Sequence, residues 1–257
     1  MLEKLHTSEF DVLKAYRQFA EFPLILSVCR QQQQGVALVD KQDNTAFVLH
    51  KSGFGGLSVS DDTSYEELFA RLIAETAIPQ YFHVYDAPQA LVQYVTGNEA
   101  IGYKLRERKQ LRYVMEDVQV PELPERYSYH IIDAGNFEDT AIFNLDIPSK
   151  FWDSADHFLA NGYGCFVAHE GKPVSICYSA CVAGGLSEID VMTLPTYQQK
   201  GLAKAVTAKY IEQSIEKDIV PNWDCFTDNT GSLRTAMNLG FAEIKAYDFL
   251  SVFLKNK

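Results

Sequence analysis

Short apolar runs separated by polar turns dominate the second half of this chain. Three of them stand close together, joined by the turns "EGKP" and "AGG", and they predict successive strands over Gly164–His169, Val174–Val182 and Leu186–Thr193. A segment rich in Ala and Lys, without Gly or Pro, then predicts a helix from about Leu202 to Lys217. The order of strands followed by a helix is typical of a mixed sheet.

Further elements surround this group. They are a strand over Tyr129–Asp133, a helical region from Phe137 to about Ala160 interrupted at Pro148, a strand in "PNWDCFTD", a helix over Thr230–Leu239 that ends at Gly240, and a strand over Ile244–Phe253. We therefore expect an α+β domain in the C-terminal half, with a mostly antiparallel mixed sheet flanked by helices.

The first half predicts a smaller mixed α/β domain. Its helices are predicted over Ser8–Phe22, Thr63–Thr76 and Ala87–Thr96, and its strands over Val36–Leu49 (broken at "DKQDN"), Gly53–Val59, Tyr81–Tyr85 and Lys109–Met115. The connector "EDVQVPELPERYSYH" holds two prolines and several acids without helical periodicity, so we place the boundary there. The predicted domains are 1–120 and 127–257.

Composition narrows the class of partner. Hydrophobic residues make up 47% of the 257 residues, which is enough for a real core. The net charge of −11 argues against a nucleic-acid partner, because phosphate binding rests on clustered Lys and Arg, and it fits a small-molecule partner. Transfer of an amino acid from tRNA is disfavoured for the same reason.

The sequence shows no pattern typical of a secreted, membrane-spanning or metal-binding protein. We find neither a signal peptide nor the roughly 18 uninterrupted apolar residues of a membrane-spanning helix, so no membrane partner is expected. The five cysteines have no framework spacing, which favours a reduced, cytoplasmic setting. The six histidines form no H-x-x-H or H-E-x-x-H pattern, so no metal is expected.

The stretch "IDVMTLPTYQQKGLAKAVTAKYI" predicts a strand that enters a helix through a polar loop with one glycine, Gly201. A helix start offers unpartnered backbone N–H groups and the positive end of the helix dipole, which suit phosphate oxygens. The loop is neither a Walker motif nor G-x-G-x-x-G. Taken alone, it is better explained as an ordinary turn between strand and helix.

Two segments together carry a resemblance. Gln198, Gly201 and Ala203 fit a Q/R-x-x-G-x-G/A pattern, and an Asn followed by a short helix ending in Gly-Phe recurs at Asn229, Ser232, Gly240 and Phe241. In this order and separation they resemble the GNAT N-acetyltransferase superfamily over about residues 127–257. The phrases "EIDVMTLPTYQQKGLA" and "PNWDC" look closest to the zwittermicin-resistance-type branch.

The resemblance implies an enzyme that uses acetyl-CoA as co-substrate and passes the acetyl group directly to a primary amine of a small molecule. It implies a cofactor site formed by Val191, Met192, Thr193, Gln198, Gln199, Lys200, Gly201, Leu202, Ala203, Asn229 and Ser232. The oligomeric state is left open, a homodimer included. The resemblance also implies that the N-terminal half is a second copy of the same fold, because related proteins often pair two such units. This copy would be degenerate, since it has no Q-x-x-G-x-A of its own.

Catalytic candidates lie on the strand before the loop. Glu188 and Asp190 are two residues apart, so both side chains are expected on one face of the sheet. One of them would be the general base, and Glu188 is the first choice because the superfamily often keeps a glutamate on this strand. The alternative is a salt bridge or a solvated face. Such a base needs a pKa raised by burial to work near neutral pH.

One position departs from the family. Where many members have a tyrosine as general acid, four residues before the Gly of Gly-Phe, this chain has Ala236. Tyr247 or Tyr210 could protonate the thiolate instead, or the thiolate could leave unassisted. Ala236 therefore also supports a second hypothesis, a non-catalytic acyl-CoA-binding or regulatory module.

Aromatic residues before the sheet are candidates for the acceptor site. Phe151 and Trp152 could line that pocket, or they could pack inward from a helix. Cys225 in "NWDCF" has no indicated His or helix-start partner, so a buried cysteine in a strand is the better interpretation.

Overall fold

The computed structural model describes residues 2–60 and 63–255. The chain divides into two compact units, which we call unit 1 (Met1–Arg108 with Ala246–Lys257) and unit 2 (Lys109–Lys245). This division differs from the predicted domains of 1–120 and 127–257, because the end of the last strand, β12 (Phe241–Leu254), pairs antiparallel with β5 (Tyr81–Tyr85) and so belongs to unit 1. Such a non-local pairing leaves no signal in the local sequence pattern.

Unit 1 is a mixed sheet with helices. Its strand order is β1-β2-β3-β4-β5-β12, with β1 at Glu3–Lys4, β2 at Gly35–Asp40, β3 at Thr45–His50 and β4 at Phe54–Ser58. Its helices are the 3-10 helices η1 (Thr7–Ala15) and η2 (Arg17–Glu21) and the α-helices α1 (Pro23–Cys29), α2 (Tyr65–Ala74) and α3 (Gln89–Thr96). The core between α2, α3 and the sheet includes Leu68, Leu72, Phe82, Leu91 and Leu250.

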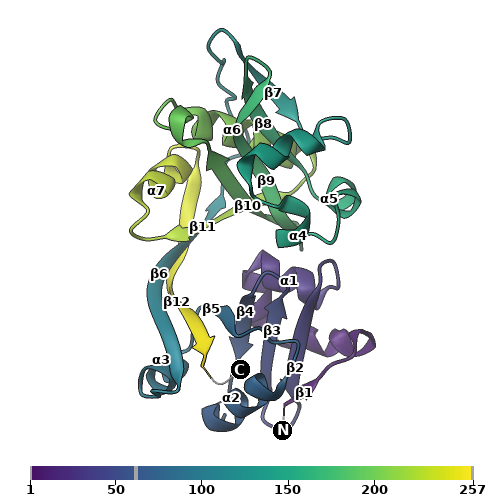
Figure 1. Ribbon diagram of the computed structural model, residues 1–257, viewed down its shortest axis with the longest axis vertical. Helices are drawn as coiled ribbons and strands as arrows, with labels where there is room; N and C mark the ends of the chain where they lie inside the picture. The colour runs from purple at the N-terminus through teal and green to yellow at the C-terminus, as the bar shows by residue number, and fades with distance from the viewer. Residues whose placement is uncertain (1, 61–62, 256–257) are drawn as a thin grey trace. The chain divides into compact units, whose positions relative to one another are not determined.

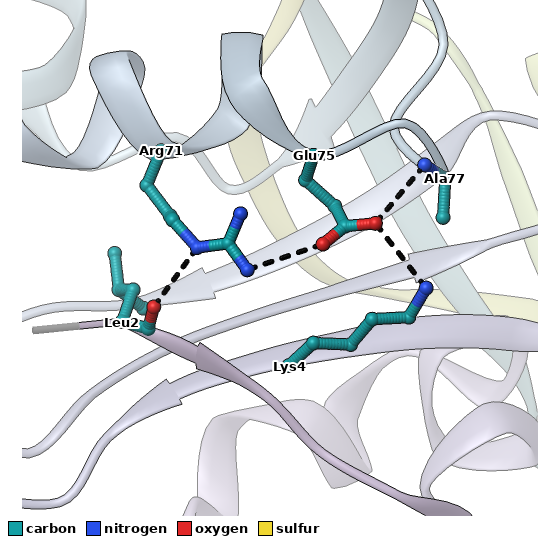
Figure 2. A network of polar contacts seen from close by, with 5 residues as sticks. All are labelled: Leu2, Lys4, Arg71, Glu75 and Ala77. Atoms are coloured by element: carbon teal, nitrogen blue, oxygen red, sulfur yellow. Dashed lines mark hydrogen bonds and ion pairs between the residues drawn. The ribbon is translucent and has the colours of Figure 1, made fainter.

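A buried carboxylate fastens the C-terminal end of α2 (Figure 2). Glu75 accepts hydrogen bonds from Lys4 Nζ (3.2 Å), Arg71 Nη2 (3.1 Å) and the Ala77 backbone N–H (3.2 Å), and Arg71 Nε also donates to the Leu2 carbonyl (3.1 Å). Burial opposes ionisation of Glu75, but these hydrogen bonds and the two positive charges lower its pKa below the ordinary value. The network therefore joins β1 to α2 while Glu75 is ionised.

Unit 2 also carries a mixed sheet. Its strand order is β6-β11-β10-β9-β8-β7, with β6 at Ile101–Tyr113, β7 at Tyr127–Ile131, β8 at Gly164–His169, β9 at Lys172–Ala183, β10 at Leu186–Thr193 and β11 at Val220–Phe226. The part of β6 before Lys109 belongs to unit 1. Its helices are η3 (Phe137–Phe143), α4 (Ile147–Lys150), α5 (Ala155–Asn161), η4 (Pro195–Tyr197), α6 (Leu202–Glu216) and α7 (Thr230–Met237). Figure 1 shows α6 and α7 beside β10 and β11.

Helices cover both faces of the unit 2 sheet. On one face, Leu202, Val206 and Tyr210 of α6 pack against Cys165 of β8 and Cys177 of β9. On the other face, Tyr178 of β9 contacts Phe158 of α5, with ring centroids 6.3 Å apart. The predicted α+β architecture with flanking helices is confirmed.

The two units repeat one topology. In unit 1, antiparallel pairs join β1 to β2, β2 to β3 and β3 to β4, and a parallel pair then joins β4 to β5, with α2 between them. Unit 2 has the same order of pairings. Antiparallel pairs join β7 to β8, β8 to β9 and β9 to β10, and a parallel pair joins β10 to β11, with α6 between them. This repeat supports the interpretation of the N-terminal half as a second copy of the fold.

Some predicted elements are wrong in type or extent. The helix predicted over Ser8–Phe22 is found as two 3-10 helices, and α1, which was not predicted, follows in the apolar run "PLILSVC". Strand β6 begins at Ile101, well before the predicted start at Lys109. The prediction missed this part because it holds a run of consecutive charged residues, Arg106 to Lys109, which shows no apolar alternation. The helical region between Phe137 and Ala160 is three short pieces.

Candidate functional site

Two neighbouring parallel strands in unit 2 separate at one end. The register between β10 and β11 covers Leu186–Glu188 opposite Val220–Asn222. Farther along, Val191 and Thr193 of β10 and Trp223 of β11 line a cavity of about 460 Å³. The strands thus pair up to Glu188 and Asn222 and enclose a space beyond them, as an extended ligand between two strands would require.

The loop that enters α6 forms one wall of this cavity. Gly201 is the N-cap residue of α6 and has φ 77°, in the left-handed region that favours glycine. A Cβ atom built at Gly201 meets nothing within 4 Å, so the backbone conformation, and not crowding, selects glycine here. The Gln198 side chain steadies the loop, since its Nε2 donates to the Thr193 carbonyl at 3.2 Å.

The start of α6 favours an anion. Its first turn holds Lys204 and no acidic residue, and Lys204 lines the cavity. A cation in the first turn is opposed by the helix dipole, and a bound anion at this position would offset that opposition. In unit 1 the equivalent helix α2 begins with Glu66 and Glu67, which would repel one. Unit 2 is therefore the copy suited to bind phosphate.

Helix α7 and β11 form the opposite wall. The Asn229 side chain caps α7 by accepting from the Ser232 N–H at 3.2 Å. The Trp223 indole N–H donates to Ser232 Oγ at 2.9 Å, which holds the ring against the helix. Both Asn229 and Ser232 thus have a local structural role and also line the cavity.

Most of the predicted cofactor residues lie at this cavity. Its lining contains Val191, Thr193, Gln198, Gln199, Gly201, Leu202, Ala203, Asn229 and Ser232. Met192 and Lys200 are described residues outside the lining; Met192 alternates with its lining neighbours along β10, and Lys200 Nζ lies 4.9 Å from the Tyr197 ring centroid. Sequence reasoning missed Tyr197, Lys204, Trp223, Gly231 and Thr235, of which only Lys204 had a signal, its charge at a helix start.

The donor set fits a phosphate-bearing cofactor. Backbone amides at the start of α6, the open space beside Gly201 and the ammonium of Lys204 could hold a pyrophosphate, and the edge of β10 at Val191–Thr193 could pair with an extended arm. Among the described residues, no three His, Cys, Asp or Glu side chains are grouped closely enough to hold a metal ion. None of the described helices is long and apolar enough to cross a membrane.

Glu188 is buried at the last paired position of the split strands. Its residue is 9% exposed, and its Oε2 accepts from Asn222 Nδ2 of β11 at 2.6 Å. Cys181 of β9 is its register partner. Burial raises the pKa of the Cys181 thiol well above its ordinary value, and the Glu188 charge raises it further. A carboxylate in this position is a candidate general base.

Asp190 lies on the same face of the sheet as Glu188. Ile189 and Val191 pack toward α6 and α7, so the alternating Glu188 and Asp190 point to the other face, as predicted. Asp190 Oδ2 accepts from the Tyr178 hydroxyl at 2.8 Å and lies 3.1 Å from Lys150 Nζ. Asp190 thus has the ion pair that the sequence left open as its alternative role.

Neither tyrosine that was a candidate proton donor is among the residues that line the cavity. Ala236 is fully buried, and Tyr210 lies in the core, where its hydroxyl donates to Ser187 Oγ at 2.9 Å. Burial raises the pKa of Tyr210 well above its ordinary value. Tyr247 belongs to unit 1, where its ring contacts Phe22. The structure therefore gives no support to either tyrosine as general acid.

Phe151 and Trp152 both lie in the core of unit 2. Trp152 is 1% exposed, and its indole N–H donates to the Ser179 carbonyl at 3.0 Å. Phe151 is 5% exposed, with Lys150 Nζ 4.7 Å from its ring centroid. This geometry favours inward packing, and contact with an acceptor stays a prediction. Cys225 is buried, as expected for a cysteine of a core strand.

Comparisons with known proteins agree with this geometry. The chain is 32% identical over 126 residues to the uncharacterized N-acetyltransferase YdfB of Bacillus subtilis (strain 168). That match covers 49% of this chain and 48% of YdfB, so it spans about half the length of the curated relative.

Solved structures share the fold over nearly the whole chain. A GCN5-related N-acetyltransferase-like protein from Streptococcus suis 89/1591 has a TM-score of 0.71 at 24% identity, covering 96% of this chain and all of that one (100%). A tandem GNAT protein from the clavulanic acid biosynthesis pathway has a TM-score of 0.64 at 12% identity, covering 98% of both chains. At these identities the likeness shows the fold, and the tandem protein fits the two-unit architecture.

A sequence model of the GNAT acetyltransferase family matches residues 17–250, which includes most of unit 1 as well as unit 2. The match is longer than the resemblance over residues 127–257 that the motifs alone carry. It agrees with the topology repeated in both units. The chain belongs to the GNAT acetyltransferase family.

Proposed function

We propose that this protein is an N-acetyltransferase that moves an acetyl group from acetyl-CoA directly to a primary amine of a small molecule. The observation that carries the proposal is the cavity at the start of α6, which opens where β10 and β11 separate, beyond their last paired residues Glu188 and Asn222. Placement in the zwittermicin-resistance-type branch belongs to the same proposal and rests on the sequence phrases alone. A cytoplasmic location stays a prediction from the cysteine spacing, and a homodimer stays open.

Binding would use the walls of the cavity. Backbone amides from Gln199 to Ala203, with Lys204, would hold the pyrophosphate at the start of α6. The edge of β10 at Val191–Thr193 would pair with the pantetheine arm, and Asn229 and Ser232 would contact the cofactor from α7. Met192 and Lys200 would contribute through their backbone, since their side chains lie outside the lining.

The chemistry assigns one role to Glu188. A primary amine is an ammonium ion at neutral pH, so it must lose a proton before it can attack. Glu188 would take that proton, directly or through water, and would become a neutral carboxylic acid. When bound, acetyl-CoA supplies a thioester whose carbon–sulfur bond breaks as the carbon–nitrogen bond forms.

A thiol has an ordinary pKa of about 8.5, so a thiolate is a tolerable leaving group without a dedicated acid. The second amine proton can then pass to the thiolate or to solvent. This matters because Ala236, at the position of the family's tyrosine, cannot donate a proton. Asp190 would have a positioning role. It would hold the side chains of Lys150 and Tyr178 on the sheet face that also carries Glu188.

A test of this function is thiol release from acetyl-CoA with a panel of primary amines. The change Glu188→Gln should lower kcat/KM by about 10²–10⁴-fold, the usual contribution of a general base. Glu170→Gln is the control, because Glu170 lies at the β8–β9 turn in an exposed pair with Arg126. Equal rates for Glu188→Gln and the wild type would overturn the role of Glu188.

The second hypothesis is a non-catalytic acyl-CoA-binding or regulatory module. Two observations favour it: Ala236 is buried, and the cavity lining contains neither Tyr210 nor Tyr247. It predicts saturable binding of acetyl-CoA without thiol release above the uncatalysed rate for any amine. Turnover that Glu188→Gln removes would exclude it.

A further inference from the structure

Asn222 holds a position that sequence reasoning did not single out. It lies in β11 directly opposite Glu188, at the last paired position before β10 and β11 separate. Its residue is 0% exposed, and its Nδ2 donates to Glu188 Oε2 at 2.6 Å. Its Oδ1 is also buried and has no hydrogen-bond partner among the described residues.

The amide is oriented by the charge of the carboxylate. An ionised carboxylate only accepts hydrogen bonds, so Asn222 must present its NH₂ group to Glu188 and turn its oxygen away. A buried acceptor without a partner is uncommon in folded proteins and requires an explanation, such as a catalytic role or a bound water. The unpartnered Oδ1 of Asn222 lies beside the proposed base, Glu188. Its hydrogen-bond donor could be a water molecule or a substrate group that is present only during the reaction.

Several titratable and charged residues face Glu188 from the neighbouring strands. The titratable and charged residues that face it are Cys181 from β9, Asp190 farther along β10, Asp224 farther along β11, and Tyr178 and Lys150, which both contact Asp190. Cys181 and Tyr178 are neutral, since burial raises the pKa of each well above its ordinary value. The two aspartates disfavour a further negative charge nearby.

We propose that Asn222 is a positioning residue for Glu188, and that its Oδ1 binds a water molecule through which the proton of the acceptor amine reaches the carboxylate. The inference rests on the proposed function and extends it. The proton leaves the ammonium nitrogen for the water, and the water gives a proton to Glu188, so that ammonium and carboxylate become amine and carboxylic acid. Donation from Nδ2 keeps Glu188 ionised until that step.

A purely structural role is the competing explanation, in which Asn222 only fastens β11 to β10. Ser187 provides the matched control. It is the neighbour of Glu188 in β10, is 0% exposed, and binds the hydroxyls of Tyr163 and Tyr210 on the opposite face of the sheet. Ser187→Ala therefore removes a buried polar contact from the same strand without touching Glu188.

The test measures kcat/KM against pH for Asn222→Asp, Asn222→Ser and Ser187→Ala, with acetyl-CoA affinity from calorimetry. Because the ionised base is the active form, loss of the amide donor should move the acidic limb to higher pH by about one unit, and farther for Asn222→Asp, which adds a negative charge. Acetyl-CoA affinity should stay within about twofold, since Asn222 does not line the cavity. An unmoved limb in both Asn222 variants, or an equal shift in Ser187→Ala, would overturn the proposal.

A second measurement does not depend on turnover. The Glu188 carboxyl carbon can be titrated by NMR in ¹³C-glutamate-labelled protein and assigned with Glu188→Gln. The midpoint should rise in Asn222→Ser and stay unchanged in Ser187→Ala. If no amine is acetylated, the proposed function fails while a raised midpoint still supports the Asn222 contact. An unchanged midpoint overturns the Asn222 inference whether or not the protein is an enzyme.

Discussion

The Tyr178 hydroxyl donates to Asp190 Oδ2 at 2.8 Å, across the antiparallel pair of β9 and β10. Lys150 Nζ lies 3.1 Å from the same oxygen. Burial raises the pKa of Tyr178 well above its ordinary value, and the charge of Asp190 raises it further, so the hydroxyl stays a donor. Asp190 Oδ2 is thereby held by two donors, one of them the Lys150 ammonium, whereas Glu188 Oε2 accepts from the neutral amide of Asn222 at the point where the strands separate.

This difference predicts unequal effects of neutralising the two carboxylates. Asp190→Asn should lower kcat/KM by less than about tenfold and reduce stability by about 0.5–2 kcal/mol, the cost of weakening partly exposed charge-assisted hydrogen bonds. Glu188→Gln should have the larger effect on activity. Steady-state rates and urea denaturation of both variants check this, and a larger rate loss in Asp190→Asn would make Asp190 the base instead.

Trp152 is expected to contribute to the stability of the fold and not to binding of the amine. Trp152→Phe removes the indole N–H that the Ser179 carbonyl accepts, so the free energy of unfolding should fall by about 1–3 kcal/mol. The KM for the amine should change by less than about twofold, because the ring is buried in the core. Denaturation and steady-state kinetics measure both quantities. A raised KM with unchanged stability would restore Trp152 as an acceptor contact.

The pH dependence of unit 1 should report on Glu75 (Figure 2). Its pKa is lowered in the folded protein, so its stabilisation is present above the unfolded value of 4.5 and is lost as the pH falls through the folded value. Glu75→Gln should therefore cost about 1–3 kcal/mol at pH 7 and much less below about pH 4.

Chemical denaturation at both pH values checks this expectation. Asp11→Asn is the control in the same unit, because Asp11 pairs with Lys14 at an exposed position and should contribute less than about 1 kcal/mol. A cost for Glu75→Gln that is equal at the two pH values would mean that packing, and not the charge of Glu75, joins β1 to α2.

The sequence pattern correctly predicted those helices and strands whose apolar spacing, turn residues and helix propensity all agree. The strand at Leu186–Thr193 and the helix after Gly201 are found as predicted, because the apolar run, the turn and the helix formers agree. The run "PLILSVC" forms the buried helix α1, which a short apolar run cannot distinguish from a strand. The charged strand β6 was only partly predicted because exposed strands lack a clear apolar face.

Some residues of the candidate site could be predicted from the sequence and others could not. The loop residues Gln198 to Ala203 were predicted from a motif that lies in one stretch of sequence. Trp223 and Asn222 were not, because their positions depend on how β11 is aligned with β10, about 30 residues earlier in the chain. Contacts of this kind are set by tertiary pairing and leave no signal in the sequence around either residue.

Cofactor binding is tested most directly by calorimetric titration with acetyl-CoA of the wild type and two glycine variants. Gly201 and Gly171 both have a positive φ (77° and 78°) and nothing within 4 Å of an added Cβ, but Gly171 lies in the turn between β8 and β9. Glutamate at either position causes the same backbone strain, and only at Gly201 does its charge enter the cavity.

We predict saturable binding by the wild type, a loss of at least about tenfold in affinity for Gly201→Glu, and near wild-type affinity for Gly171→Glu. That result would place acetyl-CoA at the start of α6. No binding by the wild type at millimolar acetyl-CoA, or equal affinity in all three proteins, would contradict the assignment of this cavity as the cofactor site.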